Sequence, residues 1–184
     1  MKILLIGYGN PGRLDDGLGP ALAERFQQAE PAPEKFPFAG ASAVAKAMAD
    51  RRTTGRKLAT LRSVPPALTI ETNYQLNVED AAQIAEVDVV IFADASTDAE
   101  PPFTFSPVIA EEGGLSFSSH SVSAPQLMGM VRDLFHAEPK AYMLAIRGYE
   151  FNEFGEMLSE KAKENLDRAV DFLKTQLLVM TGEK

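Results

Sequence analysis

The 184-residue sequence contains no cysteine. This absence excludes disulfides, thiolate metal sites and a cysteine nucleophile, and it fits a cytoplasmic protein. No apolar run approaches the length of a membrane span. Residues 1–6 are too short for a signal peptide and lead directly into a glycine-rich stretch, so they predict a first strand. We therefore expect a cytoplasmic chain with no membrane partner.

Basic charge is also scarce over most of the chain. The formal net charge is −8 at pH 7, whereas nucleic-acid-binding proteins present a basic surface. Residues 31–65 are the exception, because seven Lys or Arg stand there against two Asp or Glu; the segment carries +5 and the remainder −13. We therefore predict no nucleic-acid partner and a basic insert at about 31–65. The insert is interpreted as a surface loop, with a docking element for an acidic surface as the alternative.

The apolar pattern alternates between strands and helices. Strands are expected at 2–7, 67–72, 88–95, 103–108 (an edge strand) and 141–147, and helices at 18–28, 78–86, 124–135 and 159–179. This order predicts one α/β domain over residues 1–184, a three-layer α/β/α sandwich around a mostly parallel twisted sheet of about five strands. Ligands of such folds collect at the carboxyl ends of the strands.

A glycine-rich loop follows the first strand. Its first three glycines have the G-x-G-x-x-G spacing of dinucleotide-binding loops: Gly7, Gly9 and Gly12. However, no helix can begin before about Leu18, and Asp15 and Asp16 would repel a phosphate. The loop is therefore interpreted as one that presents a carboxylate. We expect its glycines to allow a sharp turn and the close approach of another chain.

Two further side chains are candidates for the same edge of the sheet. Asp94 follows the apolar run at 89–93, and His120 stands among serines just before the helix at 124–135. Each alone is more often a capping or turn residue. Together with Asp16, they form a plausible metal site of two carboxylates and one imidazole, without a soft thiolate.

The same residues resemble the motifs of a known family. The stretch GYGN at 7–10, followed by DDGLG at 15–19, resembles the glycine–asparagine signature of the hydrogenase maturation endopeptidases. The stretch FADA at 92–95 resembles the central strand of that family with its metal-binding aspartate. The pair SH at 119–120 resembles the metal-binding histidine that precedes a helix.

The resemblance implies a single hydrolase-type protease domain that removes the C-terminal extension from a nickel–iron hydrogenase large-subunit precursor. The enzyme would act after nickel insertion, so the nickel would be supplied by the substrate. Apart from the resemblance, we expect a monomer or weak oligomer. The nickel-recognising and catalytic residues would be Asp16, Asp94 and His120. The substrate loop would include Gly9, Asn10, Asp15 and Gly17. From this match we expect Asp16 to point into the crevice and Asp15 to cap or brace the loop. Loss of that cap in Asp15→Asn would cost about 1 kcal/mol of stability.

Three alternatives stay open. Either the metal or one of the aspartates activates the water that attacks the peptide bond. A non-catalytic factor that binds nickel or the precursor would have the same residues.

The stretch GYGNPG at 7–12 also resembles the start of bacterial peptidyl-tRNA hydrolases. Those enzymes follow this stretch with a catalytic histidine, whereas this chain has no histidine before His120 and lacks the basic balance expected of a tRNA-binding protein.

Overall fold

The computed structural model describes residues 1–29, 68–111 and 122–182. The expected basic insert at 31–65 and the candidate ligand His120 lie outside the described residues.

The described chain forms a five-stranded sheet in the order β2-β1-β3-β5-β4. Its strands are β1 (Ile3–Tyr8), β2 (Leu68–Asn73), β3 (Val89–Ser96), β4 (Phe103–Pro107) and β5 (Lys140–Arg147). All neighbouring pairs are parallel except β4 with β5, which is antiparallel and places β4 at the edge. The mostly parallel sheet expected from the sequence is confirmed, including its edge strand.

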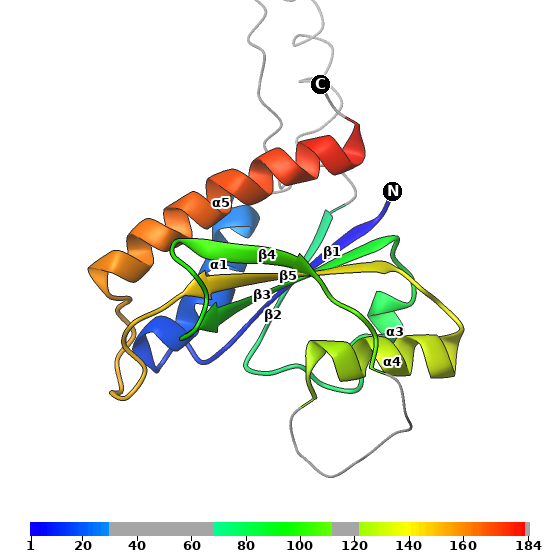
Figure 1. Cartoon of the computed structure of the whole chain (residues 1–184), viewed down its shortest axis with the longest axis horizontal. Helices are drawn as coiled ribbons and strands as arrows, with labels where there is room; N and C mark the ends of the chain where they lie inside the picture. Colours follow the sequence, from blue (N-terminus) through cyan, green and yellow to red (C-terminus); the bar gives the residue numbers. More distant parts are fainter. Residues whose placement is uncertain (30–67, 112–121, 183–184) are drawn as a thin grey trace, which may run out of the picture.

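Helices cover both faces of this sheet. They are η1 (a 3₁₀ turn, Leu14–Gly17), α1 (Leu18–Ala29), α3 (Asp80–Ile84), α4 (Ala124–Phe135) and α5 (Glu160–Thr181). Figure 1 shows α1 and α5 on one side of the sheet and α3 and α4 on the other, so the expected three-layer sandwich is confirmed. Among the helices of the described segments, none is long and apolar enough to cross a membrane.

The central strands are buried on both faces. In β1 and β3, Leu5 and Ile91 pack into the core beneath α1 and α5, whereas Leu4 and Phe92 pack into the core beneath α3 and α4. All four side chains are at most 1% exposed. A strand covered on both faces needs apolar side chains at every position, which explains the uninterrupted apolar runs in the sequence.

The strand order reverses at β1, between the carboxyl ends of β1 and β3. From β1 the chain crosses to β2 on one side, and it then returns to β3 on the other side of β1. The connections after β1 and β3 therefore lead away from each other, and this reversal is where α/β sheets bind their ligands. The loop that carries Asp16 follows β1, and Asp94 lies in the last part of β3.

Two glycines allow close backbone packing after β1: Gly9 lets the loop fold on itself, and Gly19 lets the first turn of α1 lie directly on the sheet. Gly9 has a φ of +137°, which side chains rarely adopt, and a Cβ there would overlap the carbonyl oxygen of Asp16. A Cβ on Gly19 would overlap the carbonyl oxygens of Tyr8 and Ala93. The expectation that the glycines admit another chain is therefore wrong at these two positions, because the chain's own backbone fills the space.

We predict that Gly19→Ala destabilises the protein by about 3 kcal/mol or more, because its methyl group would push α1 away from β1 and β3. Gly12→Ala is the matched control in the same loop. Its Cβ would meet only the Asn10 Oδ1 atom, at 3.2 Å, so we expect a loss below about 1 kcal/mol. Urea unfolding measures both, and equal losses would contradict the close packing described for Gly19.

Candidate functional site

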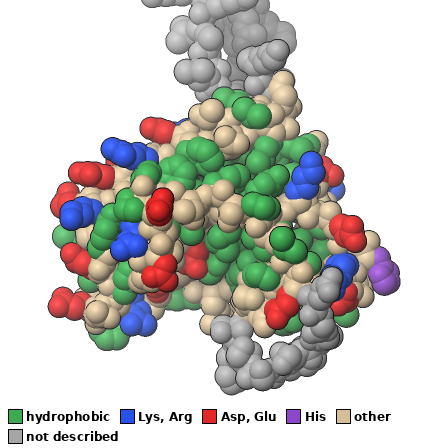
Figure 2. Space-filling model, in the orientation of Figure 1, with side chains coloured by type: hydrophobic (Ala, Val, Ile, Leu, Met, Phe, Trp, Pro, Cys, Tyr) green, Lys and Arg blue, Asp and Glu red, His purple; other side chains and the backbone are tan. Residues whose placement is uncertain are grey.

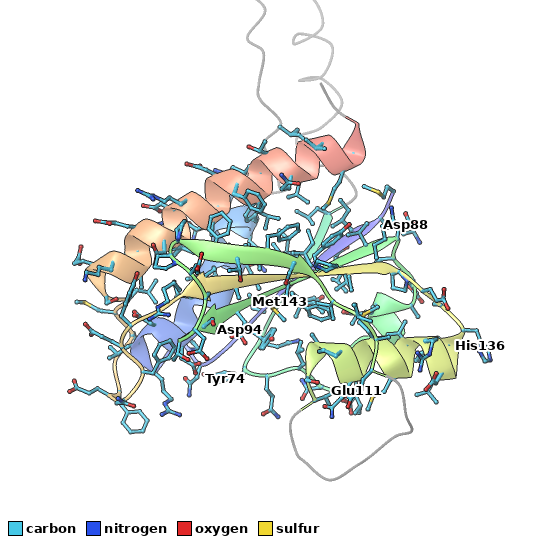
Figure 3. All side chains as sticks on the ribbon, in the orientation of Figure 1. Tyr74, Asp88, Asp94, Glu111, His136 and Met143 are labelled. Atoms are coloured by element: carbon cyan, nitrogen blue, oxygen red, sulfur yellow. The ribbon has the colours of Figure 1, made fainter. Side chains whose placement is uncertain are left out.

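Two carboxylates from distant parts of the sequence come together at the carboxyl edge of the sheet. Asp94 lies on β3 (Figure 3), and Asp16 belongs to η1. Burial raises the pKa of Asp94 to about 6 and the nearby Asp16 charge adds to the rise, although hydrogen bonds from the Tyr8 side chain and the Ala95 backbone oppose it. The Ala95 amide donates to Asp94 Oδ1 at 2.7 Å. The two carboxylates are therefore near enough for the charge of Asp16 to disfavour the charge of Asp94.

Tyr8 is a neighbour of Asp94 that the sequence analysis missed. Its hydroxyl hydrogen-bonds to the Asp94 carboxylate, and burial together with the Asp94 charge raises the pKa of Tyr8 far above its ordinary value. Tyr8 therefore stays a protonated donor and orients the carboxylate. The signal lay in the register, because Gly7 of β1 pairs with Ala93 of β3 and the next residues of both strands are Tyr8 and Asp94.

Asp16 is held within its own loop. Its Oδ2 atom accepts a hydrogen bond from the Asn10 backbone at 3.1 Å, and Asn10 Oδ1 accepts from the Gly12 backbone at 2.9 Å. The Asp16 side chain is half-buried, in contrast to that of its neighbour Asp15. One loop thus buries the side chain of the first aspartate and leaves that of the second partly exposed.

Asp15 joins this loop to the segment that precedes α5. Its side chain is 0% exposed. The carboxylate accepts hydrogen bonds from the backbones of Tyr149, Glu150 and Ser159 at 2.8, 3.0 and 2.7 Å, and from the Ser159 hydroxyl at 2.8 Å. Burial alone would raise the pKa of Asp15, but these hydrogen bonds outweigh it and hold the pKa below its ordinary value. This carboxylate faces the protein interior and not a substrate.

The same two segments also pair through their backbones. Arg13 and Gly155 form an isolated parallel bridge. The Leu14 amide donates to the Gly155 carbonyl at 2.8 Å, and the Gly155 amide donates to the Gly12 carbonyl at 3.0 Å. The segment between β5 and α5 is therefore fixed beside the loop that carries Asp16.

The described residues supply two of the three expected metal ligands. Nowhere in the described ranges do three or more His, Cys, Asp or Glu side chains form a group that could hold a metal ion. Asp16 and Asp94 offer hard oxygen ligands, which suit a divalent cation. The expected third ligand, His120, lies outside the described residues, and His136 is at the opposite end of the sheet from Asp94 (Figure 3).

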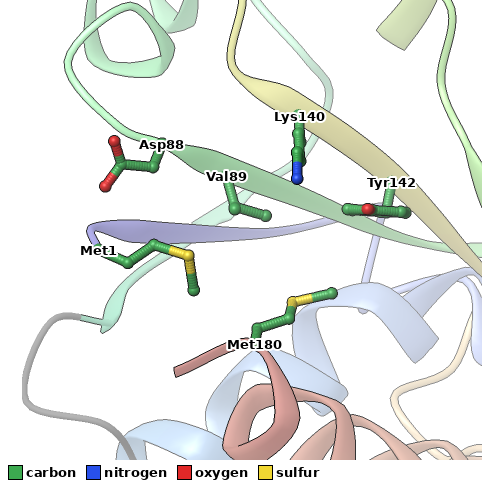
Figure 4. A pocket seen from close by; sticks show the side chains of 6 residues that line it. All are labelled: Met1, Asp88, Val89, Lys140, Tyr142 and Met180. Atoms are coloured by element: carbon green, nitrogen blue, oxygen red, sulfur yellow. The ribbon is translucent and has the colours of Figure 1, made fainter. Parts of the chain in front are cut away.

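A pocket of about 460 Å³ lies at the other edge of the sheet. It is lined by Met1, Asp88, Val89, Lys140, Tyr142 and Met180 (Figure 4). Val89 and Lys140 are the first residues of β3 and β5, so the pocket is at the amino ends of the strands. It is therefore separate from the carboxylate pair.

Comparison with known proteins identifies the fold. No protein-family model matches the chain, and no curated protein matches it. The crystal structure of the [NiFe] hydrogenase maturation protease HycI from Thermococcus kodakarensis KOD1 is similar with a TM-score of 0.62 and 17% identity, over 96% of this chain and 92% of that one. The hydrogenase maturating endopeptidase HybD from E. coli is similar with a TM-score of 0.60 and 18% identity, over 99% of this chain and 94% of that one. This chain has the hydrogenase maturation protease fold.

The resemblance noted in the sequence is thus confirmed at the level of the fold. The hydrogenase 2 maturation peptidase from Thaumarchaeota archaeon SCGC_AB-539-E09 shares the fold as well, with a TM-score of 0.55 and 17% identity over 96% of this chain and 98% of that one. In the hydrogenase maturation protease fold of this chain, Asp16 and Asp94 lie where the strand order reverses.

The four hydrogen bonds of Asp15 raise the loss of stability that we expect when this carboxylate is replaced. We predict that Asp15→Asn lowers the free energy of unfolding by about 2 kcal/mol or more, because an amide group would face donors that need an acceptor. Because folding lowers the pKa of this carboxyl, its contribution is present above pH 4 and is lost as the pH falls below about 4. Urea unfolding at pH 7 and at about pH 2.5 checks this, and the difference between variant and wild type should be smaller at the lower pH; a loss below about 0.5 kcal/mol at pH 7 would contradict it.

Asp94 gives the opposite prediction. Its pKa is raised to about 6, so the native state binds a proton more tightly than the unfolded state and stability falls as the pH rises from about 4 to 6. Asp94→Asn removes this penalty and is expected to stabilise the protein at pH 7 by up to about 2 kcal/mol, with no gain at pH 4. Urea unfolding at both pH values tests the difference.

The exposed neighbour Asp98 provides the matched control, since Asp98→Asn removes the same charge outside the crevice. It should leave stability nearly unchanged at both pH values. An Asp94→Asn protein that is less stable than the wild type at pH 7 would show that the Asp94 charge is favourable in the native state, against our expectation.

Proposed function

We propose that this chain is an endopeptidase that removes the C-terminal extension from the large-subunit precursor of a nickel–iron hydrogenase. The observation that carries the proposal is the pair of neighbouring carboxylates, Asp16 and Asp94, at the strand-order reversal. The fold is shared with proteins described as a [NiFe] hydrogenase maturation protease and a hydrogenase maturating endopeptidase, which supports the substrate class.

In this proposal the pair recognises nickel that arrives with the precursor. Carboxylate oxygens are suitable ligands for a divalent cation, and a cation between two close carboxylates offsets their mutual repulsion. Asp16 and Asp94 would supply the oxygen ligands, and His120 would supply an imidazole nitrogen. The Tyr8 hydrogen bond keeps the Asp94 carboxylate oriented. A precursor without nickel would leave the repulsion in place, so cleavage would wait for nickel insertion.

The cleavage itself is peptide-bond hydrolysis. A water oxygen adds to the scissile carbonyl carbon, the carbon–nitrogen bond breaks, and the leaving nitrogen takes up a proton. Substrate-borne nickel can polarise the carbonyl and lower the pKa of a bound water. One of the two carboxylates can instead remove the proton from that water as a general base. Both routes require Asp16 and Asp94 beside the scissile bond.

A non-catalytic nickel- or precursor-binding factor would bind the precursor without cutting it. Incubation of the purified protein with nickel-loaded precursor, followed by mass spectrometry, separates the two functions. The proposed endopeptidase releases the C-terminal peptide, whereas a binding factor leaves the precursor intact.

We predict that Asp16→Asn reduces cleavage of the nickel-loaded precursor by about a hundredfold or more, because the side chain keeps its size but loses its charge. Its stability should be close to that of the wild type, since the amide oxygen can still accept from the Asn10 backbone. Glu86→Gln, at an exposed position before β3, is the charge-matched control and should cleave normally. Wild-type cleavage by Asp16→Asn would exclude this carboxylate as a nickel ligand.

A further inference from the structure

Two large apolar side chains are exposed on the loop that joins β5 to α5. Phe154 is 91% exposed and Met157 is 75% exposed. Single exposed apolar residues are common on protein surfaces. These two, however, stand three positions apart on one loop, on either side of Gly155, which bridges to the loop that carries Asp16. Figure 1 shows this loop at the same end of the sheet as η1.

The loop is held firmly enough to present these side chains in a fixed place. Asp15 accepts hydrogen bonds from its first part, and Gly155 pairs with Gly12 and Leu14. The Arg13 guanidinium also donates to the Phe151 carbonyl at 3.4 Å. The apolar groups are therefore displayed by a braced segment, so that little conformational entropy is lost when a partner covers them.

Tyr149, in the same loop, serves the chain itself. Two cations lie over its ring, the Arg147 guanidinium at 5.4 Å and the Lys161 ammonium at 5.6 Å from the ring centroid. Its hydroxyl accepts a hydrogen bond from Asn165 at 3.2 Å. These contacts give Tyr149 a structural role, and Phe154 and Met157 remain as the apolar groups offered to solvent.

Within the loop itself the charges have one sign, although the exposed Arg13 of the neighbouring loop lies beside Phe151 and Gly155. Residues 148–158 include three glutamates and neither Lys nor Arg. All three glutamates, Glu150, Glu153 and Glu156, are exposed. Figure 2 shows that charged side chains of both signs gather at this end of the molecule, whereas the middle is largely apolar. A partner that fits here needs apolar side chains for Phe154 and Met157 and positive charges for the glutamates.

We propose that Phe154 and Met157, together with the three glutamates of the loop, form a docking surface for a segment of the precursor polypeptide. That segment would be rich in apolar and basic side chains. We call this the β5–α5 docking surface; its glutamates are Glu150, Glu153 and Glu156. This inference rests on the proposed function, because it identifies how the same site holds its protein substrate. Because the surface is braced against the loop of Asp16, a precursor bound there has its scissile bond kept near the carboxylates.

The test compares the double variant Phe154→Ser/Met157→Ser with the wild type, using the nickel-loaded precursor as the probe. Both side chains are exposed, so the fold should be unaffected. We expect KM for cleavage and Kd for precursor binding to rise by about ten- to a hundredfold with kcat unchanged, because the docking contacts are away from the reacting bond. Val179→Ser is the matched control, since Val179 is 69% exposed near the far end of α5.

A second variant tests the charges. Glu150→Gln/Glu153→Gln/Glu156→Gln should weaken precursor binding at low salt, and it should lose most of the salt dependence seen with the wild type. An unchanged salt dependence would contradict the inference that the partner segment is basic.

The outcomes separate this inference from the proposed function. If the wild type cleaves the precursor and the double variant has the same KM and kcat, the docking surface alone is overturned. Binding without cleavage by the wild type overturns the endopeptidase alone, and the variants' Kd then decides the docking surface. A precursor that does not bind the wild type overturns both.

Discussion

The buried carboxylate of Asp15 holds together the parts of the molecule on which the site depends. Through one side chain, the loop after β1 is bonded to Tyr149, Glu150 and Ser159. Ser159 also caps α5, since its hydroxyl oxygen accepts from the Ala162 backbone at 3.3 Å. A negative charge at the start of a helix is favourable as well. The position of Asp16, and that of the β5–α5 docking surface, both follow from this set of hydrogen bonds.

Two aspartates at the same edge of the sheet have opposite electrostatic roles. Asp15 has its pKa lowered, because the hydrogen bonds to its charged form outweigh burial. Asp94 has its pKa raised, because burial and the Asp16 charge outweigh the two hydrogen bonds that it accepts. By linkage, we expect the first carboxylate to stabilise the fold and the second to destabilise it at neutral pH. A buried charge that lowers stability is typical of a functional site. Shifted pKa values cluster at such sites, and structural ion-pair networks also shift pKa values.

The fold could be predicted from local pattern, whereas much of the site could not. The apolar run before Asp94 and the helix start at Leu18 depend on neighbouring residues, and both appear in the structure as expected. The bonds from Asp15 to Tyr149 and Ser159 join residues far apart in the sequence, where no periodicity connects them. The Tyr8 contact required the register of two parallel strands. The third expected ligand, His120, stays a prediction, because it lies outside the described residues.

The central claim is that the carboxylate pair recognises nickel carried by the protein substrate. The most direct measurement incubates the wild-type protein with the same large-subunit precursor in nickel-loaded and nickel-free forms, and follows the released C-terminal peptide by mass spectrometry. Our account predicts release from the nickel-loaded precursor and none from the nickel-free one. Equal release from both forms, or release from neither, would contradict it.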